Sequence, residues 1–156
     1  MKKTGFFWHV HHKKLLEWCY DYDERVEYIQ GHKPTSEKEL RLRLLRPVRG
    51  VLPRNLVEAW QAYDGARLAY DKARRAFHKA WQVHHGINLV NYPKARQNCE
   101  NAWQNYEYAR QNCERAQLLA YDVKIKIKDM PAIEALHREE CPNCPWDGRT
   151  ILPDAW

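Results

Sequence analysis

The stretch that decides the fold lies at residues 59–86 and reads AWQAYDG-ARLAYDK-ARRAFHK-AWQVHHG, four seven-residue repeats in succession. After the segment INLVNYPK, the repeat resumes at 95–122 as ARQNCEN-AWQNYEY-ARQNCER-AQLLAYD. Alanine occupies the first position of every repeat, and the fourth position of the first block is always alanine or valine. An apolar period of 3.5 residues over four repeats is typical of packed α-helices, and alanine has the highest helix propensity.

The interruption between the two blocks predicts a turn, because Gly86 favours a helix end and Pro93 a helix start. We therefore expect helices over 55–85 and 93–122, folded into an antiparallel hairpin. Each helix would be ~45 Å long, which is more than the remaining residues can cover. The sequence predicts a homo-oligomer in which hairpins associate as a four-helix bundle; a compact monomer covered by the rest of the chain is the alternative.

The second block carries a row of asparagines at the fourth position, Asn98, Asn105 and Asn112. Such a row is typical of amides that hydrogen-bond across a helix seam and fix its register. The alternative is a polar groove that faces a ligand.

The whole chain is expected to form a single, mainly α-helical domain, with a base at 1–54, the hairpin at 55–122 and a second part of the base at 123–156. Apolar periodicity predicts a helix over 12–30, and the capping-box pattern SEKE predicts another from Ser36 to Arg46. The stretch DVKIKIK alternates apolar and basic residues, so it is either a strand paired with GFFWHVHH at 5–12 in a two-stranded sheet or an extension of the second long helix. Pro131 is expected to open a short helix through Glu139.

A metal site is predicted near the end of the sequence, where LHREECPNCPWDG gives His137, Cys141 and Cys144 an H-x3-C-x2-C spacing. Zn²⁺ takes four nitrogen or sulfur ligands in a tetrahedron, so one ligand is missing from this stretch. The N-terminal part of the chain offers it, and our predicted choice is His12 among the candidates His9, His11, His12 and Cys19. A solvated CxxC pair without metal is the alternative.

An enzymatic alternative rests on His9-x-His11, since metal-dependent hydrolases often present two histidine ligands at a strand end. The sequence lacks a glycine-rich phosphate loop and a G-x-S-x-G motif, which argues against the commonest nucleotide hydrolases and esterases. We therefore favour a protein that acts by binding and has no catalytic residues.

The formal net charge of +6 and a pI of about 9.1 favour anionic partners. Arginine forks suit phosphates, and aromatic or imidazole rings suit bases. The predicted ligand-binding residues are His9, His11, Trp18, Tyr22, Arg41, Arg43, Arg46 and Arg49.

No apolar run approaches the ~20 residues of a membrane span, and the early histidines interrupt any signal-peptide pattern, so we expect a cytoplasmic protein with reduced cysteines.

Three segments, GFFWHVHHKKLLEWCYDYDERVEYI, RLRLLRPVRGVLP and ECPNCPWDGRTIL, together with the alanine/tyrosine heptads, resemble a family of uncharacterised proteins from metagenomic and phage-borne sequences. The asparagine row departs from the heptads of that family. The resemblance implies no activity. A phage context favours a small counter-defence protein that sequesters a nucleotide-type signal or binds nucleic acid; a protein–protein adaptor acting through the hairpin is the other binding alternative.

Overall fold

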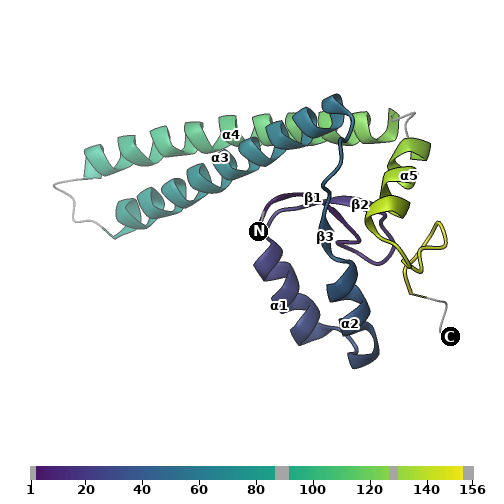
Figure 1. Cartoon of the computed structure of the whole chain (residues 1–156). Helices are drawn as coiled ribbons and strands as arrows, with labels where there is room; N and C mark the ends of the chain where they lie inside the picture. The colour runs from purple at the N-terminus through teal and green to yellow at the C-terminus, as the bar shows by residue number, and fades with distance from the viewer. Residues whose placement is uncertain (1–2, 87–91, 127–129, 153–156) are drawn as a thin grey trace. The chain divides into compact units, whose positions relative to one another are not determined.

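The computed structural model describes residues 3–86, 92–126 and 130–152, and the chain divides into two compact units. The first unit combines residues 1–53 with 128–156, and the second comprises residues 54–127. The described residues form five helices and three short strands (Figure 1). This confirms the predicted class, a mainly α-helical chain with a long helical hairpin and a small antiparallel sheet. No helix among the described residues has an apolar stretch of the length needed to span a membrane.

The second unit is the predicted hairpin, made of α3 (Arg54–His85) and α4 (Tyr92–Lys126). Aromatic pairs join the two helices, with ring centroids 5.5 Å apart for Tyr70 and Tyr106 and 5.1 Å apart for Phe77 and Trp103. Helix α4 continues through residues 123–126, which excludes a strand there; residues 127–129 lie outside the described part. No glycine or proline interrupts the sequence between Ala95 and Lys126, so the helix has no local reason to end earlier.

The asparagine row does not form the seam of the hairpin. Asn98 and Asn105 are exposed and Asn112 is half-buried, so the expected network of buried amides between the helices is wrong. The seam instead uses the first position of each repeat and the residue four places later. The two positions lie only about 40° apart around a helix, so both can face one neighbour.

The first unit contains a three-stranded antiparallel sheet with the order β2-β1-β3, formed by β1 (Gly5–Trp8), β2 (Leu16–Cys19) and β3 (Arg46–Pro47). Phe6 pairs with Trp18, and Trp8 pairs with Leu16 on one side and with Arg46 on the other. The predicted sheet is therefore present, but its strands differ from those expected. Nearby segments supply both partners of β1, which removes the need for the distant residues 123–129.

The helix predicted over 12–30 is wrong in its first half. Residues 16–19 are strand β2, and the helix α1 (Tyr22–His32) begins only after Asp21, whose carboxylate accepts hydrogen bonds from the N–H groups of Asp23 and Glu24. The next helix, α2 (Thr35–Leu44), follows Pro34 and has no side-chain cap, so the predicted capping box does not form.

One hydrophobic cluster in the core of the first unit joins residues of β1, β2 and α1. Its buried members are Phe7, Val10, Cys19, Ile29 and Leu45. The Tyr22 ring stacks on Phe7 with centroids 5.7 Å apart, which ties the start of α1 to β1. Phe7 and Trp8 on β1 are both fully buried, so this strand is covered on both faces.

Helix α5 (Met130–Glu140) is fastened to the sheet by the carboxylate of its last residue. Glu140 accepts hydrogen bonds from Trp8 Nε1 at 2.9 Å and from the backbone N–H groups of Gly50 at 2.5 Å and Arg49 at 3.1 Å. A Cβ atom at residue 50 would overlap Cδ1 of Leu136, so any larger residue there requires the Leu136 side chain to move. Burial raises the pKa of Glu140, but these donors outweigh it and the net pKa lies below the usual value.

We predict that Glu140→Gln destabilises the first unit by about 2 kcal/mol, because it removes the charge that three N–H donors face. Urea unfolding at pH 7 measures this loss. The lowered pKa adds stability above the usual carboxyl pKa, and that stability is lost as the pH falls through the folded-state pKa, so the difference between wild type and variant should shrink in acid. Glu139→Gln is the matched control on the same turn; an equal effect there would contradict the role of Glu140.

Candidate metal centre

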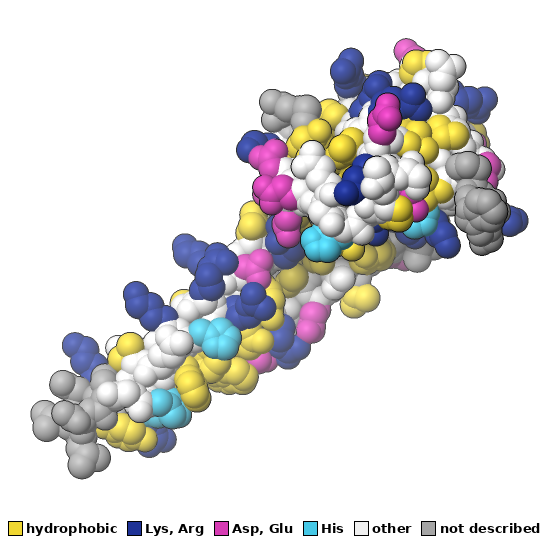
Figure 2. Space-filling model, turned by 90° about the horizontal axis from the view of Figure 1, so that it is seen from below, with side chains coloured by type: hydrophobic (Ala, Val, Ile, Leu, Met, Phe, Trp, Pro, Cys, Tyr) yellow, Lys and Arg dark blue, Asp and Glu magenta, His cyan; other side chains and the backbone are white. Residues whose placement is uncertain are grey.

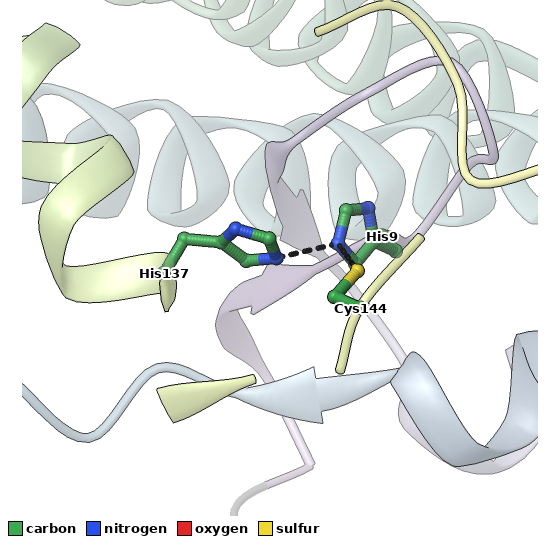
Figure 3. A group of neighbouring side chains, drawn as sticks. All are labelled: His9, His137 and Cys144. Atoms are coloured by element: carbon green, nitrogen blue, oxygen red, sulfur yellow. Dashed lines mark hydrogen bonds between the residues drawn. The ribbon is translucent and has the colours of Figure 1, made fainter. Parts of the chain in front are cut away.

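Three potential metal-ligating atoms converge where the end of β1 meets the C-terminal segment (Figure 3). Nε2 of His9 lies 2.9 Å from Nε2 of His137 and 3.3 Å from Sγ of Cys144. All three atoms lie within 4.8 Å of one another. The cluster could therefore hold a metal ion. It is the only such group of three that the described residues form.

Each ligand is positioned by a different local structure. His9 follows directly after β1 and has a left-handed backbone with φ of 52°. His137 lies in the last turn of α5, and Cys144 follows a tight turn in which Asn143 has φ of 62°. Left-handed conformations are costly for residues other than glycine and often occur at functional sites. Both here adjoin the cluster.

The two histidines are held in the neutral form. Burial, and then the neighbouring His137, lower the pKa of His9 to about 4, while the backbone of Lys14 acts weakly in the opposite direction. Burial and Arg138 lower the pKa of His137. A neutral imidazole keeps a lone pair on one nitrogen, which is the form that binds a metal.

The thiol groups are held protonated by burial, while nearby arginines favour the thiolate. Burial raises the pKa of Cys144, and the Trp146 backbone and the Arg43 charge oppose that rise. Burial and the charge of Cys144 raise the pKa of Cys141 to about 11, and Arg46 opposes the rise. A bound cation would stabilise the thiolates much more strongly than these guanidinium groups do.

Cys141 lies beside the cluster without belonging to the group of three. It is buried, its backbone N–H donates to the His137 carbonyl at 2.8 Å, and its own carbonyl accepts from the N–H of Cys144 at 3.2 Å. A cavity of about 330 Å³ opens next to both thiols and is also lined by His137, Arg138 and Trp146. The predicted set of His137, Cys141 and Cys144 is thus gathered in one place.

The histidine that joins this set is His9, not our chosen His12. The Nδ1 atom of His12 lies 3.1 Å from the guanidinium of Arg41, and the His11 ring bonds the Glu17 carboxylate at 2.6 Å. Cys19 lies in the apolar core. His9 and His11 therefore contact different partners, and the His9-x-His11 hydrolase stays a prediction.

The eight predicted ligand-binding residues are not gathered into one site. Arg41 is buried and pairs with Glu37 at 2.7 Å, and Arg46 donates to the backbone of Arg43. Arg49 lies beside Glu140, where its backbone N–H bonds the carboxylate. Tyr22 packs on Phe7, and His9 belongs to the metal cluster. His11 and Trp18 line one cavity of about 270 Å³ together with Arg25 and Tyr28, and Arg46 and Arg49 line a different cavity of about 570 Å³.

Arg25 is the residue that the sequence did not single out. Its Nε and Nη2 atoms are buried and have no hydrogen-bond partner among the described residues, and its guanidinium lies 5.3 Å from the centre of the Tyr28 ring. Burial and the charge of Arg41 lower its pKa. The sequence could not have identified Arg25, because its burial depends on how α1 packs against the sheet and no local pattern marks a single arginine in a helix as buried.

Comparison of the chain with protein-family models, with curated proteins and with solved structures gives no match. The site must therefore be judged on its own geometry.

We predict that His9 of the metal-free protein stays neutral until the pH approaches 4, because burial opposes its protonation. The ring would gain a proton more easily in the unfolded chain, so the free energy of unfolding should fall as the pH drops from about 6.5 toward 4, by on the order of 3 kcal/mol. NMR titration of the His9 ring checks the pKa, and chemical unfolding along the same pH series checks the stability. A His9 midpoint near 6.5 would contradict its burial in the neutral form.

Proposed function

We propose that the chain is a non-enzymatic binding protein whose first unit is closed by one structural Zn²⁺, bound by His9, His137, Cys141 and Cys144. The observation that carries the proposal is the convergence of the His9, His137 and Cys144 donor atoms. Imidazole and thiolate are the ligands typical of structural zinc, whereas Mg²⁺ and Ca²⁺ require oxygen ligands.

The distances support a tetrahedral ion. Zn–N bonds of about 2.0–2.1 Å and Zn–S bonds of about 2.3 Å place two nitrogens about 3.3 Å apart and a nitrogen about 3.6 Å from a sulfur. The corresponding distances here are 2.9 Å between His9 and His137 and 3.3 Å between His9 and Cys144. Small side-chain movements are enough to open the cluster around an ion.

Cys141 is the fourth ligand in this proposal. It lies three residues before Cys144, and the intervening turn has Asn143 in the left-handed conformation, which reverses the chain between the thiols. Arg43 and Arg46 favour the two thiolates. Four protein ligands leave no position for water, which is the difference between a structural and a catalytic zinc site.

A zinc ion here would join chain segments that are far apart in sequence. His9 and Cys144 are separated by 135 residues. The sheet of the first unit is small, since two of its strands have four residues and the third has two. Metal binding that requires the folded chain adds its free energy to folding, which small cores often need.

We predict about one zinc per chain in protein purified without a tag, measured by elemental analysis. His9→Asn and Cys144→Ser should each lose the metal and lower the Tm by roughly 10 °C or more. Asparagine is chosen at position 9 because it tolerates the left-handed backbone there. His12→Asn is the matched control from the same segment and should keep the metal.

The number of protons that zinc binding releases, measured by calorimetry, tests whether Cys141 is the fourth ligand. Both thiols have raised pKa values and carry their protons at pH 7, so zinc should displace two protons in calorimetry across buffers of different ionisation enthalpy. Cys141→Ser should release one. One proton from the wild type would remove Cys141 from the site, and metal retained by Cys144→Ser would overturn the zinc proposal as a whole.

A second candidate function is capture of a nucleotide-type anion, and the buried Nε and Nη2 atoms of Arg25, which have no hydrogen-bond partner among the described residues, favour it. Two buried N–H donors without an acceptor, in the field of a second buried arginine, favour a bound phosphate or carboxylate. Trp18 and Tyr28 offer aromatic surface in the same cavity. Three carboxylates also line it: Glu17 bonds His11, Asp21 caps α1, and Glu24 is exposed in the first turn of that helix.

We predict that ADP quenches the tryptophan fluorescence of the wild type. Arg25→Gln should weaken the apparent affinity for ADP at least tenfold, which is the order of magnitude expected when a pair of charge-assisted hydrogen bonds is lost. Inorganic phosphate should compete with ADP. Lys13→Gln removes one charge from an exposed position of the same unit and should bind as the wild type does. Equal weakening in both variants would mean nonspecific attraction to a basic protein.

A further inference from the structure

The hairpin of α3 and α4 is almost without a buried core of its own. Between residues 61 and 119, the described residues include only one that is buried, Ala95. Large apolar side chains are exposed on both helices over the same span, including Val83 at 48%, Tyr108 at 69% and Leu119 at 58%. Hydrophobic side chains lie along much of the length of the hairpin in the view of Figure 2. Two helices share one line of contact, which buries only part of each apolar stripe.

The seven-residue repeat identifies the covered part of each stripe. The first-position alanines are half-buried in both helices, apart from the buried Ala95, and so are the residues four places later, such as Tyr70 and Tyr106, apart from the buried Ala120. These two positions form the seam between α3 and α4. A helix that faces two neighbours in a bundle also needs small or apolar residues at the fourth position of the repeat.

The fourth-position residues are uncovered. We call them the open face; they are Ala62, Ala69, Ala76 and Val83 on α3, and Asn98, Asn105, Asn112 and Leu119 on α4. All are exposed except Asn112, which is half-buried, and none carries a charge. On each helix, the fourth position is rotated in the same direction away from the seam positions. Because the two helices run in opposite directions, this rotation brings both rows to the same side of the hairpin, where they form one surface.

The opposite side of the hairpin carries ion pairs, and Trp81 and Trp103, each 47% exposed, occupy the same position of the repeat as its arginines. Arg67 bonds Asp64 at 2.9 Å, Arg110 bonds Glu114 at 2.6 Å, and Arg96 bonds Glu100 at 2.9 Å, each within its own helix. Such a surface is stable in water and loses these hydrated ion pairs if it is buried. The two broad sides therefore differ in what they can contact.

We propose that the open face binds the open face of a second copy of this chain, and that two hairpins form an antiparallel four-helix bundle. The available surface is roughly 45 Å by 20 Å, or about 900 Å², from the length of some 30 residues and the width of two helices. Stable dimers bury about 800 Å² on each partner. Nucleic acid is the poorer occupant, because its phosphates require positive charge and this face has none.

The open face of a second copy has the same seven-residue spacing and side chains that suit contact with the first. Its helices present the same seven-residue spacing, so knobs of one hairpin meet holes of the other along the whole length. A twofold axis brings the same surface from each partner into contact. Alanine permits close approach of the helices, and the asparagine amides can bond across the interface and fix its register.

Analytical ultracentrifugation of the full chain tests this proposal. The wild type should sediment as a dimer, and Ala69→Glu/Ala76→Glu should raise the dimer dissociation constant by on the order of 100-fold or more, because both charges would be buried against a like surface. Gln61→Glu/Gln82→Glu is the control, since it adds the same two charges on the exposed side away from the seam. It should remain dimeric.

Two results would overturn the proposal: a wild-type chain that stays monomeric up to about 0.1 mM, or open-face variants that dimerise as tightly as the control. A wild-type chain that stays monomeric and binds duplex DNA or RNA through its hairpin would also overturn the proposal. Because the open-face variant could lose its helices, circular dichroism is recorded for each protein. The Tm of the wild type provides a test without any substitution, since it must rise with protein concentration if folded dimers dissociate on unfolding.

Discussion

The end of β1 is the point on which the first unit depends. Trp8 and His9 are adjacent, yet one donates a hydrogen bond to Glu140 at the end of α5 and the other contacts both His137 and Cys144. The same strand pairs with β2 and β3 and supplies Phe7 to the core. The last residue of the strand and the residue after it thus contact a C-terminal segment more than 120 positions away in the chain.

This arrangement explains why the histidine cluster has strained backbone around it. A strand that ended in the ordinary extended conformation would alternate its side chains between the two faces of the sheet. The left-handed backbone of His9 breaks that alternation directly after Trp8. The cost of such a conformation is on the order of 1 kcal/mol or more, and a metal ion bound at His9 would offset it.

The two units have different sources of stability. The first has a mixed core, a carboxylate held by three N–H donors and a cluster of side chains that could hold a metal ion. The second has long helices rich in alanine, with ion pairs along each helix and a seam of aromatic contacts. Local interactions are enough to form such helices, but they leave half of the apolar stripe without a partner. The proposed dimer supplies that partner.

The sequence by itself determined the hairpin, because its helices follow from a local repeat: α3 and α4 begin and end within four residues of their predicted limits. It also pointed to two members of the candidate metal cluster, because His137 and Cys144 stand in one short stretch with a recognisable ligand spacing. Only the tertiary structure decided that His9 joins them and that His12 contacts Arg41, since these are contacts between segments that no local pattern relates. Only the packing of α3 on α4 decided which apolar rows form their seam and which remain uncovered, because a repeat of seven gives each helix several positions that can face a neighbour.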